Sequence, residues 1–248
     1  MTNSTEKRIY NFRELHETFS EYRKDNVWLF RGHSDSTWKL IPKVARSPYR
    51  EDRDKIFFDS WKRRAKEFLP NINDDWTLLG IAQHHGLATR LLDWTYNPLV
   101  AAFFAVQDFK ECDAAIFAYR DAYDVNVEDY TTLFDVEGIQ KFKPNASARR
   151  ITSQGGIFTI HNPPHLDLEE NLRKDCNLEK IIIDKSYRRE LRFELNHYGI
   201  NDVTIFPDLD GLSKHVNFYM ENKAFWSSKE ISDLEEANLE EEVQKLYD

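Results

Sequence analysis

The chain has 248 residues, 41% of them hydrophobic and 14% aromatic, and this apolar content can build a folded core and argues against intrinsic disorder. A net charge of −9 argues against nucleic-acid binding through an overall basic surface, and eight glycines and eight prolines argue against a low-complexity chain. The N-terminus has no apolar signal-peptide core, and the longest apolar run, residues 99–106, is too short to cross a bilayer. We therefore expect a cytoplasmic protein with no membrane partner.

Apolar spacing and capping residues predict the elements of the first third of the chain. In chain order they are a helix over 11–24, a strand over 27–30, an extended connection over 38–42, a helix over 50–69 and a helix ended by Gly86. Asp74 or Asp75 can cap this last helix, and a glycine suits the position just past a helix end. The strand over 27–30 leads straight into Arg31 and Gly32, so we expect the arginine to leave a strand end.

The remainder of the chain mixes strands with helices. In order we predict an extended segment over 89–95, a buried helix over 99–107, strands over 114–119, 157–161 and 180–184, a helix over 186–199, a strand over 203–206 and a helix over 212–221. Asn97 and Pro98 suit the start of the helix over 99–107. Residues 121–153 show no clear periodicity and receive no assignment. The pattern predicts an α+β fold, a mixed central β-sheet flanked by helices, in a globular domain over 1–225 followed by an acidic segment over 226–248.

Four ordered blocks of the sequence carry a family resemblance. They are Trp28 to His33 followed by Trp38 to Pro42 and Arg46, then Ala82 to Thr95 with Asn97-Pro98, then Gln154 to Thr159, and finally Gly199 to Gly211. In these blocks the chain resembles the FRG domain of bacterial or phage-type proteins. The resemblance implies one globular domain and a setting of bacterial conflict such as phage defence.

A second resemblance, to the arginine-type branch of the ADP-ribosyltransferases, suggests a chemistry. Phe30-Arg31-Gly32 is similar to the strand-end arginine with which those enzymes open. Asp93-Trp94-Thr95, and the helix containing 101–105, are similar in order and spacing to the serine- or threonine-containing strand and the helix that follow. The enzymes finish with a glutamate ahead of a strand, and here the matching position is Gln154. The resemblance implies an ADP-ribosyltransferase-like architecture, with NAD as substrate and Arg31, Asp93 and Gln154 as catalytic candidates.

The case for Arg31 and Gly32 also rests on their own chemistry. Arginine is permanently charged and binds phosphate oxygens through a planar fork, and glycine allows close backbone approach. Asp93 and Thr95 precede a predicted helix N-terminus, where free N–H groups favour an anion. Asp93 could hold a ribose hydroxyl or pair with Arg31 or Arg90. The structural alternatives are an Arg31 that ties strand to loop and an Arg90–Asp93 pair that orders the segment.

Several further polar residues lie at element ends and are candidates for binding the dinucleotide. They are Gln83, His84, His85, Arg90, Asp208 and Asp210. Adjacent histidines on a helix, such as His84 and His85, point about 100° apart and do not chelate one metal ion easily. His161 and His165 lack the helical spacing of a metal site. We therefore expect no metal. Asp208 and Asp210 equally suit a turn and helix N-cap. Trp28, Trp38 and Trp94 could stack on a ligand ring or belong to the core.

The acidic segment carries eight acids and two lysines between residues 226 and 248. One helical face contains Ile231, Leu234, Asn238 or Leu239, Val243 and Leu246. We therefore expect a helix that packs on the domain or binds a partner, with self-association as the favoured partner case, or else a frayed tail. For the whole chain we predict an NAD-using ADP-ribosyltransferase, or an NAD-cleaving relative, acting on a macromolecular acceptor or water. The alternative is a non-catalytic FRG module that binds a nucleotide or a macromolecule.

Overall fold

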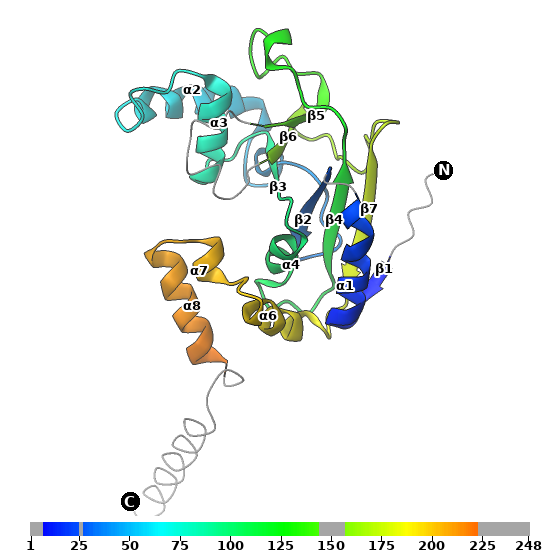
Figure 1. Cartoon of the computed structure of the whole chain (residues 1–248). Helices are drawn as coiled ribbons and strands as arrows, with labels where there is room; N and C mark the ends of the chain where they lie inside the picture. Colours follow the sequence, from blue (N-terminus) through cyan, green and yellow to red (C-terminus); the bar gives the residue numbers. More distant parts are fainter. Residues whose placement is uncertain (1–6, 25–26, 144–156, 223–248) are drawn as a thin grey trace, which may run out of the picture. The chain divides into compact units, whose positions relative to one another are not determined.

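The computed structural model describes residues 7–24, 27–143 and 157–222. The chain divides into two compact units, residues 1–197 and 198–248. The first unit contains a four-stranded sheet in the order β1-β7-β4-β2 (Figure 1). Its strands are β1 (Lys7–Ile9), β7 (Asn177–Ile183), β4 (Ala114–Arg120) and β2 (Trp28–His33). β1 runs parallel to β7 and the other pairs are antiparallel, so the predicted mixed sheet is confirmed.

A second sheet in the same unit is fully antiparallel and was not predicted. It has the order β3-β6-β5, with β3 (Leu91–Trp94), β6 (Ile157–Asn162) and β5 (Gly138–Phe142). The two sheets are joined where Phe30 of β2 and Thr95, just after β3, exchange backbone hydrogen bonds of 2.7 and 2.9 Å. This bridge holds the β2 strand beside the end of β3.

Two helices cover one face of the four-stranded sheet, α1 (Phe12–Glu21) and α4 (Pro98–Val106) (Figure 1). Phe30 points to this face, where its ring meets Phe19 of α1 edge-on at 6.0 Å. Gly32 lies under α4 so closely that an added Cβ would stand 2.0 Å from the Ala101 carbonyl oxygen. Only a residue without a side chain fits between this strand and this helix.

The first core cluster lies on the opposite face of the sheet, between it and the second sheet. It is formed by Leu29, Leu40, Leu92, Trp94, Ala115, Phe117, Tyr119, Ile139, Ile157, Leu168, Cys176 and Ile182. Burial of this apolar area is the main stabilising contribution that joins the two sheets.

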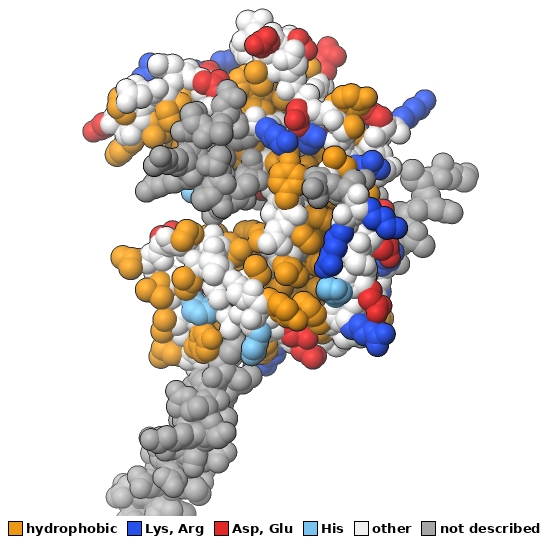
Figure 2. All heavy atoms as spheres, in the orientation of Figure 1, with side chains coloured by type: hydrophobic (Ala, Val, Ile, Leu, Met, Phe, Trp, Pro, Cys, Tyr) orange, Lys and Arg blue, Asp and Glu red, His pale blue; other side chains and the backbone are white. Residues whose placement is uncertain are grey.

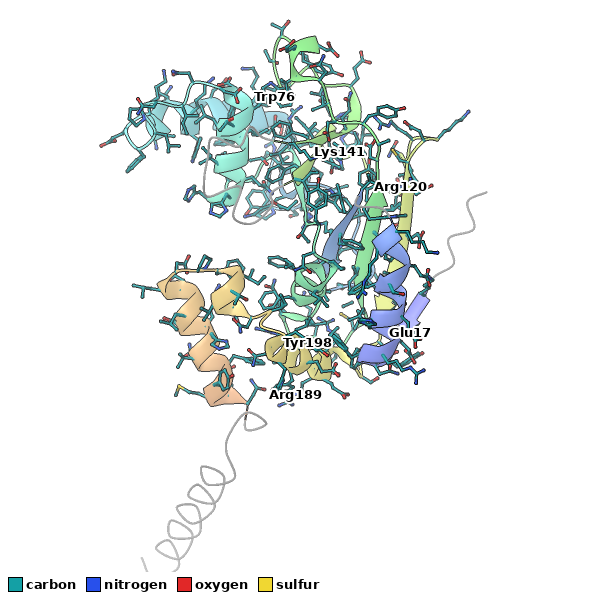
Figure 3. All side chains as sticks on the ribbon, viewed as in Figure 1. Glu17, Trp76, Arg120, Lys141, Arg189 and Tyr198 are labelled. Atoms are coloured by element: carbon teal, nitrogen blue, oxygen red, sulfur yellow. The ribbon has the colours of Figure 1, made fainter. Side chains whose placement is uncertain are left out.

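A second core cluster joins the three-stranded sheet to α2 (Asp54–Ala65) and α3 (Asp75–His84). Phe58 comes from α2, Leu78, Leu79 and Ala82 come from α3, and Leu91, Phe158 and Ile160 come from the sheet. Trp76 of α3, labelled in Figure 3, packs on Phe142 of β5 with ring centroids 5.0 Å apart. Three short 3-10 turns lie between the helices and strands of this unit, at Lys43–Ala45, Glu51–Arg53 and Val127–Asp129, and a fourth, Tyr22–Lys24, extends α1.

A buried arginine fastens α6 (Arg188–His197) to the first sheet. The Arg188 guanidinium donates hydrogen bonds to four backbone carbonyls, those of Ser34, Cys112, Ala105 and Asp108, at 2.6–3.3 Å. These carbonyls lie just past β2, just before β4 and at the end of α4. One buried side chain therefore provides hydrogen bonds to backbone carbonyl groups of three chain segments.

The predicted caps of two helices, α3 and α4, are present. The Asp74 side chain accepts from the backbone N–H groups of Trp76 and Thr77 at the start of α3, and Asn97 caps α4 with Pro98 in its first turn. Gly86 has φ +88°, as a glycine past a helix end requires. The strand predicted over 27–30 is longer than expected, because β2 pairs with β4 as far as His33. Arg31 and Gly32 therefore lie inside a strand.

The second unit contains α7 (Asp202–Ile205) and α8 (Leu209–Glu221). The strand predicted over 203–206 is wrong, because Asn201 and Thr204 form a reciprocal capping box that begins α7. Asp208 accepts from the Gly211 N–H as the N-cap of α8, which begins three residues earlier than predicted. An apolar stripe of Leu209, Leu212, Val216 and Met220 is exposed along α8 (Figure 2). The predicted boundary at residue 225 stays a prediction, and the acidic segment lies outside the described residues.

Candidate functional site

The alternation of side chains along β2 decides where Arg31 points. Phe30 and Gly32 face the helices, so Leu29, Arg31 and His33 face the second sheet. Arg31 is in register with Phe117 of β4, which in turn pairs with Lys180 of β7. The strand therefore fixes a guanidinium between the two sheets of the first unit, at the end of the core cluster.

Three contacts hold the Arg31 side chain, of which 17% is exposed. Its Nε donates to Nε2 of His33 at 3.0 Å, and its Nη1 donates to the Asp93 carbonyl oxygen at 2.8 Å. The same Nη1 lies 3.8 Å from the Asp93 carboxylate. Among the described residues no hydrogen bond engages Nη2. Of the predicted alternatives for Asp93, the pairing with Arg31 is present. The bond to the Asp93 carbonyl is also a tie of the kind that the structural alternative for Arg31 predicted. Among the described residues, Nη2 is the terminal nitrogen left for a further acceptor.

The surroundings of Arg31 are electropositive. Burial lowers the pKa of Arg31 to about 10, with Asp93 opposing the shift, so the guanidinium stays charged at neutral pH. Burial also lowers the pKa of Arg46, which hydrogen-bonds the Ile41 carbonyl oxygen. The pKa of His33 is lowered to about 3, first by burial and then by the charges of Arg31 and Arg46. His33 is therefore neutral at pH 7 and lies near two cations, Arg31 and Arg46. The charges of these two side chains would stabilise an anion that binds here.

The Asp93 carboxylate is oriented by α3. Gln83 Nε2 donates to Asp93 Oδ2 at 2.7 Å, while Gln83 Oε1 accepts from the Thr89 hydroxyl at 2.6 Å. The Asp93 carboxylate can only accept, so the Gln83 NH₂ faces it and the Gln83 Oε1 faces the Thr89 hydroxyl, which itself accepts from the Leu91 N–H. This chain fixes the amide with its NH₂ toward Asp93. The Asp93 side chain is still 55% exposed, so a ligand can reach it.

A buried chain of hydrogen bonds supports the same region from β6. The Trp94 indole N–H donates to the Thr159 hydroxyl at 3.2 Å, and this hydroxyl lies 2.9 Å from Nε2 of His161. The His161 Nδ1 lies 2.8 Å from the Leu166 carbonyl oxygen, which can only accept. His161 therefore carries a proton on Nδ1. Burial lowers its pKa to about 4, and Arg31 adds to the shift.

Comparison with known families covers the part of this geometry that lies on β2, α3 and β3. Residues 26–114 match the FRG domain family model. The chain carries an FRG domain. The match includes β2, Gln83 and Asp93, and it ends at the start of β4. Neither the curated proteins nor the solved structures returned a match to the chain.

Within the FRG domain, Arg90 lies apart from Asp93. Its Nε donates to the Asp54 carboxylate of α2 at 2.7 Å, both side chains are buried, and the guanidinium lies 4.5 Å from the Phe134 ring centroid. The predicted alternative of an Arg90–Asp93 pair is wrong. Arg90 instead fastens α2 to the start of β3, and its assignment as a binding residue stays a prediction.

The predicted Gln83-His84-His85 group is divided by the helix geometry. Gln83 points to Asp93, whereas His85 lines an open, mainly apolar hollow of about 690 Å³ between α2 and α3, together with Trp61, Arg64 and Phe68. The His84 ring is exposed and meets the His85 ring edge-on at 5.2 Å. The structure therefore brings together Arg31, Asp93 and Gln83, and places the two histidines on another side of the helix end.

The remaining predicted residues have structural contacts or lie elsewhere. Thr95 bridges to Phe30 through its backbone, and its hydroxyl accepts from the Asn97 N–H at 3.1 Å. Asp208 and Asp210 belong to the second unit, and Gln154 lies outside the described residues. All four stay predictions as ligand-binding or catalytic residues.

Metal and membrane features were searched across residues 7–24, 27–143 and 157–222. No group of three or more His, Cys, Asp or Glu side chains there is placed to hold a metal ion. In the same ranges, no helix combines the length and the apolar composition needed to cross a bilayer.

Sequence reasoning missed His33, Thr89, Thr159 and His161 as members of the Arg31 region. The sequence did contain a signal for His33. It lies two residues after Arg31, and residues two apart on a strand lie on the same face. Thr159 and His161 share a face of β6 in the same way, but nothing in the sequence shows that this face meets Trp94.

Proposed function

We propose that this FRG domain binds NAD and transfers or releases its ADP-ribose, as ADP-ribosyltransferases do. The observation that carries the proposal is Arg31, fixed on β2 between two sheets, with its Nη2 bonded to none of the described residues and the Asp93 carboxylate beside it. A role in bacterial conflict is part of the same proposal.

Arg31 suits the pyrophosphate of the dinucleotide. Its Nη2 is the nitrogen that would donate to a phosphate oxygen, and such charge-assisted bonds are stronger than neutral ones. Its Nε and Nη1 are bonded within the protein, which fixes the orientation of the fork before a ligand arrives. Arg46 adds positive charge close by, as its influence on the pKa of His33 shows.

Asp93 suits the reacting ribose. Cleavage of NAD breaks the bond between C1′ and the pyridinium nitrogen, and nicotinamide leaves with the bonding electron pair. The positive charge that develops on the ribose ring resembles an oxocarbenium ion, which a nearby carboxylate stabilises. The acceptor then bonds to C1′ and gives up its proton. Gln83 holds Asp93 in place through the 2.7 Å hydrogen bond, which is the kind of preorganisation such a step requires.

The resemblance to arginine-type ADP-ribosyltransferases supports this assignment in the order of its parts. Arg31 lies on an early strand, and Thr95 follows β3 and is bridged to the Arg31 strand. The apolar helix α4 comes next and packs on Gly32. These parts are adjacent in space as well as in sequence.

The second candidate function is a module that binds a nucleotide without turnover. The observation in its favour is Gln154, an uncharged amide where the transferases have a glutamate. An amide can hydrogen-bond a ribose hydroxyl but does not stabilise positive charge as a carboxylate does. In that case Arg31 and Asp93 would hold a ligand that leaves unchanged.

The test is nicotinamide release from NAD by the full chain, measured together with NAD affinity. Wild-type protein is expected to release nicotinamide. Asp93→Asn is expected to lower the rate by about 10²- to 10³-fold, as loss of a charge-stabilising group does, and to change affinity by only a few-fold. Glu128→Gln, a change at an exposed carboxylate on the 3-10 turn Val127–Asp129, is the control. NAD binding without release would select the second candidate, and no NAD binding at all would overturn the proposal.

A further inference from the structure

Three tryptophans could face a ligand ring, and their surroundings differ. Trp94 is 4% exposed and uses its indole N–H on Thr159. Trp28 packs on Tyr22 with ring centroids 4.9 Å apart. Trp38 alone among these three is strongly exposed, at 43% of its surface.

The Trp38 indole is held in place although it is exposed. Its backbone N–H donates to the Asp35 carbonyl oxygen at 3.2 Å, in a turn that the Thr37 hydroxyl closes on the Asp35 carboxylate. The Lys110 ammonium lies 4.2 Å from the ring centroid and also donates to the Ser34 hydroxyl at 3.2 Å. A cation at this distance from an indole is attracted by the ring.

Trp38 is separated from Arg31 by one side chain. The His33 ring, which accepts a hydrogen bond from Arg31 Nε, meets the Trp38 ring edge-on with centroids 6.1 Å apart. The exposed indole therefore stands near two cations, Lys110 over its ring and Arg31 beyond His33. A fixed aromatic surface next to a fixed guanidinium matches a ligand in which a planar ring is linked to phosphate.

We infer that Trp38 stacks on a planar aromatic ring of the ligand whose phosphate Arg31 binds, so that the site selects nucleotides over phosphates without an aromatic ring. The inference rests on the proposed function for the phosphate and adds the residue that recognises the ring. One base stacked on an aromatic side chain contributes about 1–3 kcal/mol of binding free energy, which corresponds to roughly 5- to 150-fold in affinity.

The experiment titrates inorganic pyrophosphate, ribose 5-phosphate, ADP-ribose and NAD into the full chain by calorimetry. Trp38→Ala is expected to weaken the binding of ADP-ribose and NAD at least about fivefold and to change the binding of pyrophosphate and ribose 5-phosphate, which have no aromatic ring, by less than twofold. Trp38→Phe keeps an aromatic face and is expected to restore most of the affinity. Phe68→Ala removes another exposed aromatic side chain, 79% exposed beside the hollow between α2 and α3, and should change none of the four.

The outcomes separate this inference from the proposed function. NAD binding that is unchanged in Trp38→Ala would overturn the inference and leave the proposed function standing. Equal weakening of pyrophosphate and NAD in Trp38→Ala, or a melting temperature well below wild type, would show that Trp38 supports the fold and would also overturn it. Failure of the wild-type chain to bind NAD or ADP-ribose would overturn both.

Discussion

Single residues near Arg31 are held in defined protonation states. His161 is fully buried, and its two ring nitrogens lie within hydrogen-bond distance of Thr159 and the Leu166 carbonyl oxygen. We expect its pKa, followed through the ring chemical shifts by NMR, to lie near 4 rather than near 6.5. A value close to 6.5 would contradict the buried, neutral state.

The same shift predicts a dependence of stability on pH. Unfolded His161 binds a proton below about pH 6.5, whereas the folded residue stays neutral until about pH 4. The free energy of unfolding should therefore fall as the pH is lowered through this window, by about 3 kcal/mol from His161. Urea unfolding at pH 7.5 and pH 4.5 should show a smaller loss in His161→Gln than in wild type. His16→Gln, a change at an exposed histidine of α1, should keep the full loss.

Among single residues, the sequence predicted those whose candidate role follows from the chemistry of the side chain itself. Arg31, Asp93 and Gln83 were predicted as site residues, and the structure brings them into contact. Arg90 could not be placed, because its partner Asp54 lies 36 residues earlier and no local pattern links the two. His161 was considered only as a metal ligand with His165. Its neutral, buried role depends on a sheet that the sequence did not reveal.

Helices and strands were predicted best where local chemistry decides them. The caps at Asp74 and Asn97 act through hydrogen bonds within three residues, so the sequence contains all the partners. The segment over 203–206 has β-branched residues typical of a strand, yet the Asn201–Thr204 capping box outweighs that preference. β1 has three residues and β5 has five, and both depend on distant partners.

The close contact between Gly32 of β2 and helix α4 gives a prediction about the stability of the fold. Gly32→Ala places a Cβ 2.0 Å from a backbone oxygen that cannot rotate away, so strand and helix must separate. We expect a loss of about 3 kcal/mol or more in the free energy of unfolding, at the upper end of overpacking costs.

Gly86→Ala is the control for Gly32→Ala, because it also adds a Cβ to a glycine. Gly86 has nothing within 4 Å of an added Cβ and carries only the strain of its φ of +88°. That strain costs about 1–2 kcal/mol for a residue with a side chain. A Gly32→Ala loss in urea unfolding no larger than the Gly86→Ala loss would contradict the close packing of β2 and α4.

For the whole molecule, the α+β class and the mixed sheet follow from the order of strands and helices. The division into two sheets does not, because it depends on which strands pair across long stretches of chain. The bridge between Phe30 and Thr95, residues 65 positions apart, is what brings the two halves of the candidate site together.

The acidic segment over 226–248 gives a prediction about the melting temperature and the molar mass of the whole chain. Its apolar positions predict that it packs on the domain or binds a partner, with self-association as the favoured case. Deleting residues 227–248 is expected to lower the melting temperature if the segment packs on its own chain, and the molar mass in solution if it joins two chains. A deletion that changes neither quantity would leave only a solvated tail.

The most direct test of the account is calorimetric titration of NAD into the wild-type chain and into two Arg31 variants. Arg31→Ala should weaken binding by about 2–4 kcal/mol, roughly 30- to 1,000-fold, with the melting temperature close to wild type. Arg31→Lys should restore little, because a lysine cannot bond His33 and the Asp93 carbonyl oxygen while it also presents a further nitrogen to the phosphate. Equal NAD affinity in wild type and Arg31→Ala, or an Arg31→Ala chain that does not fold, would show that Arg31 has a structural role and would contradict the proposed site.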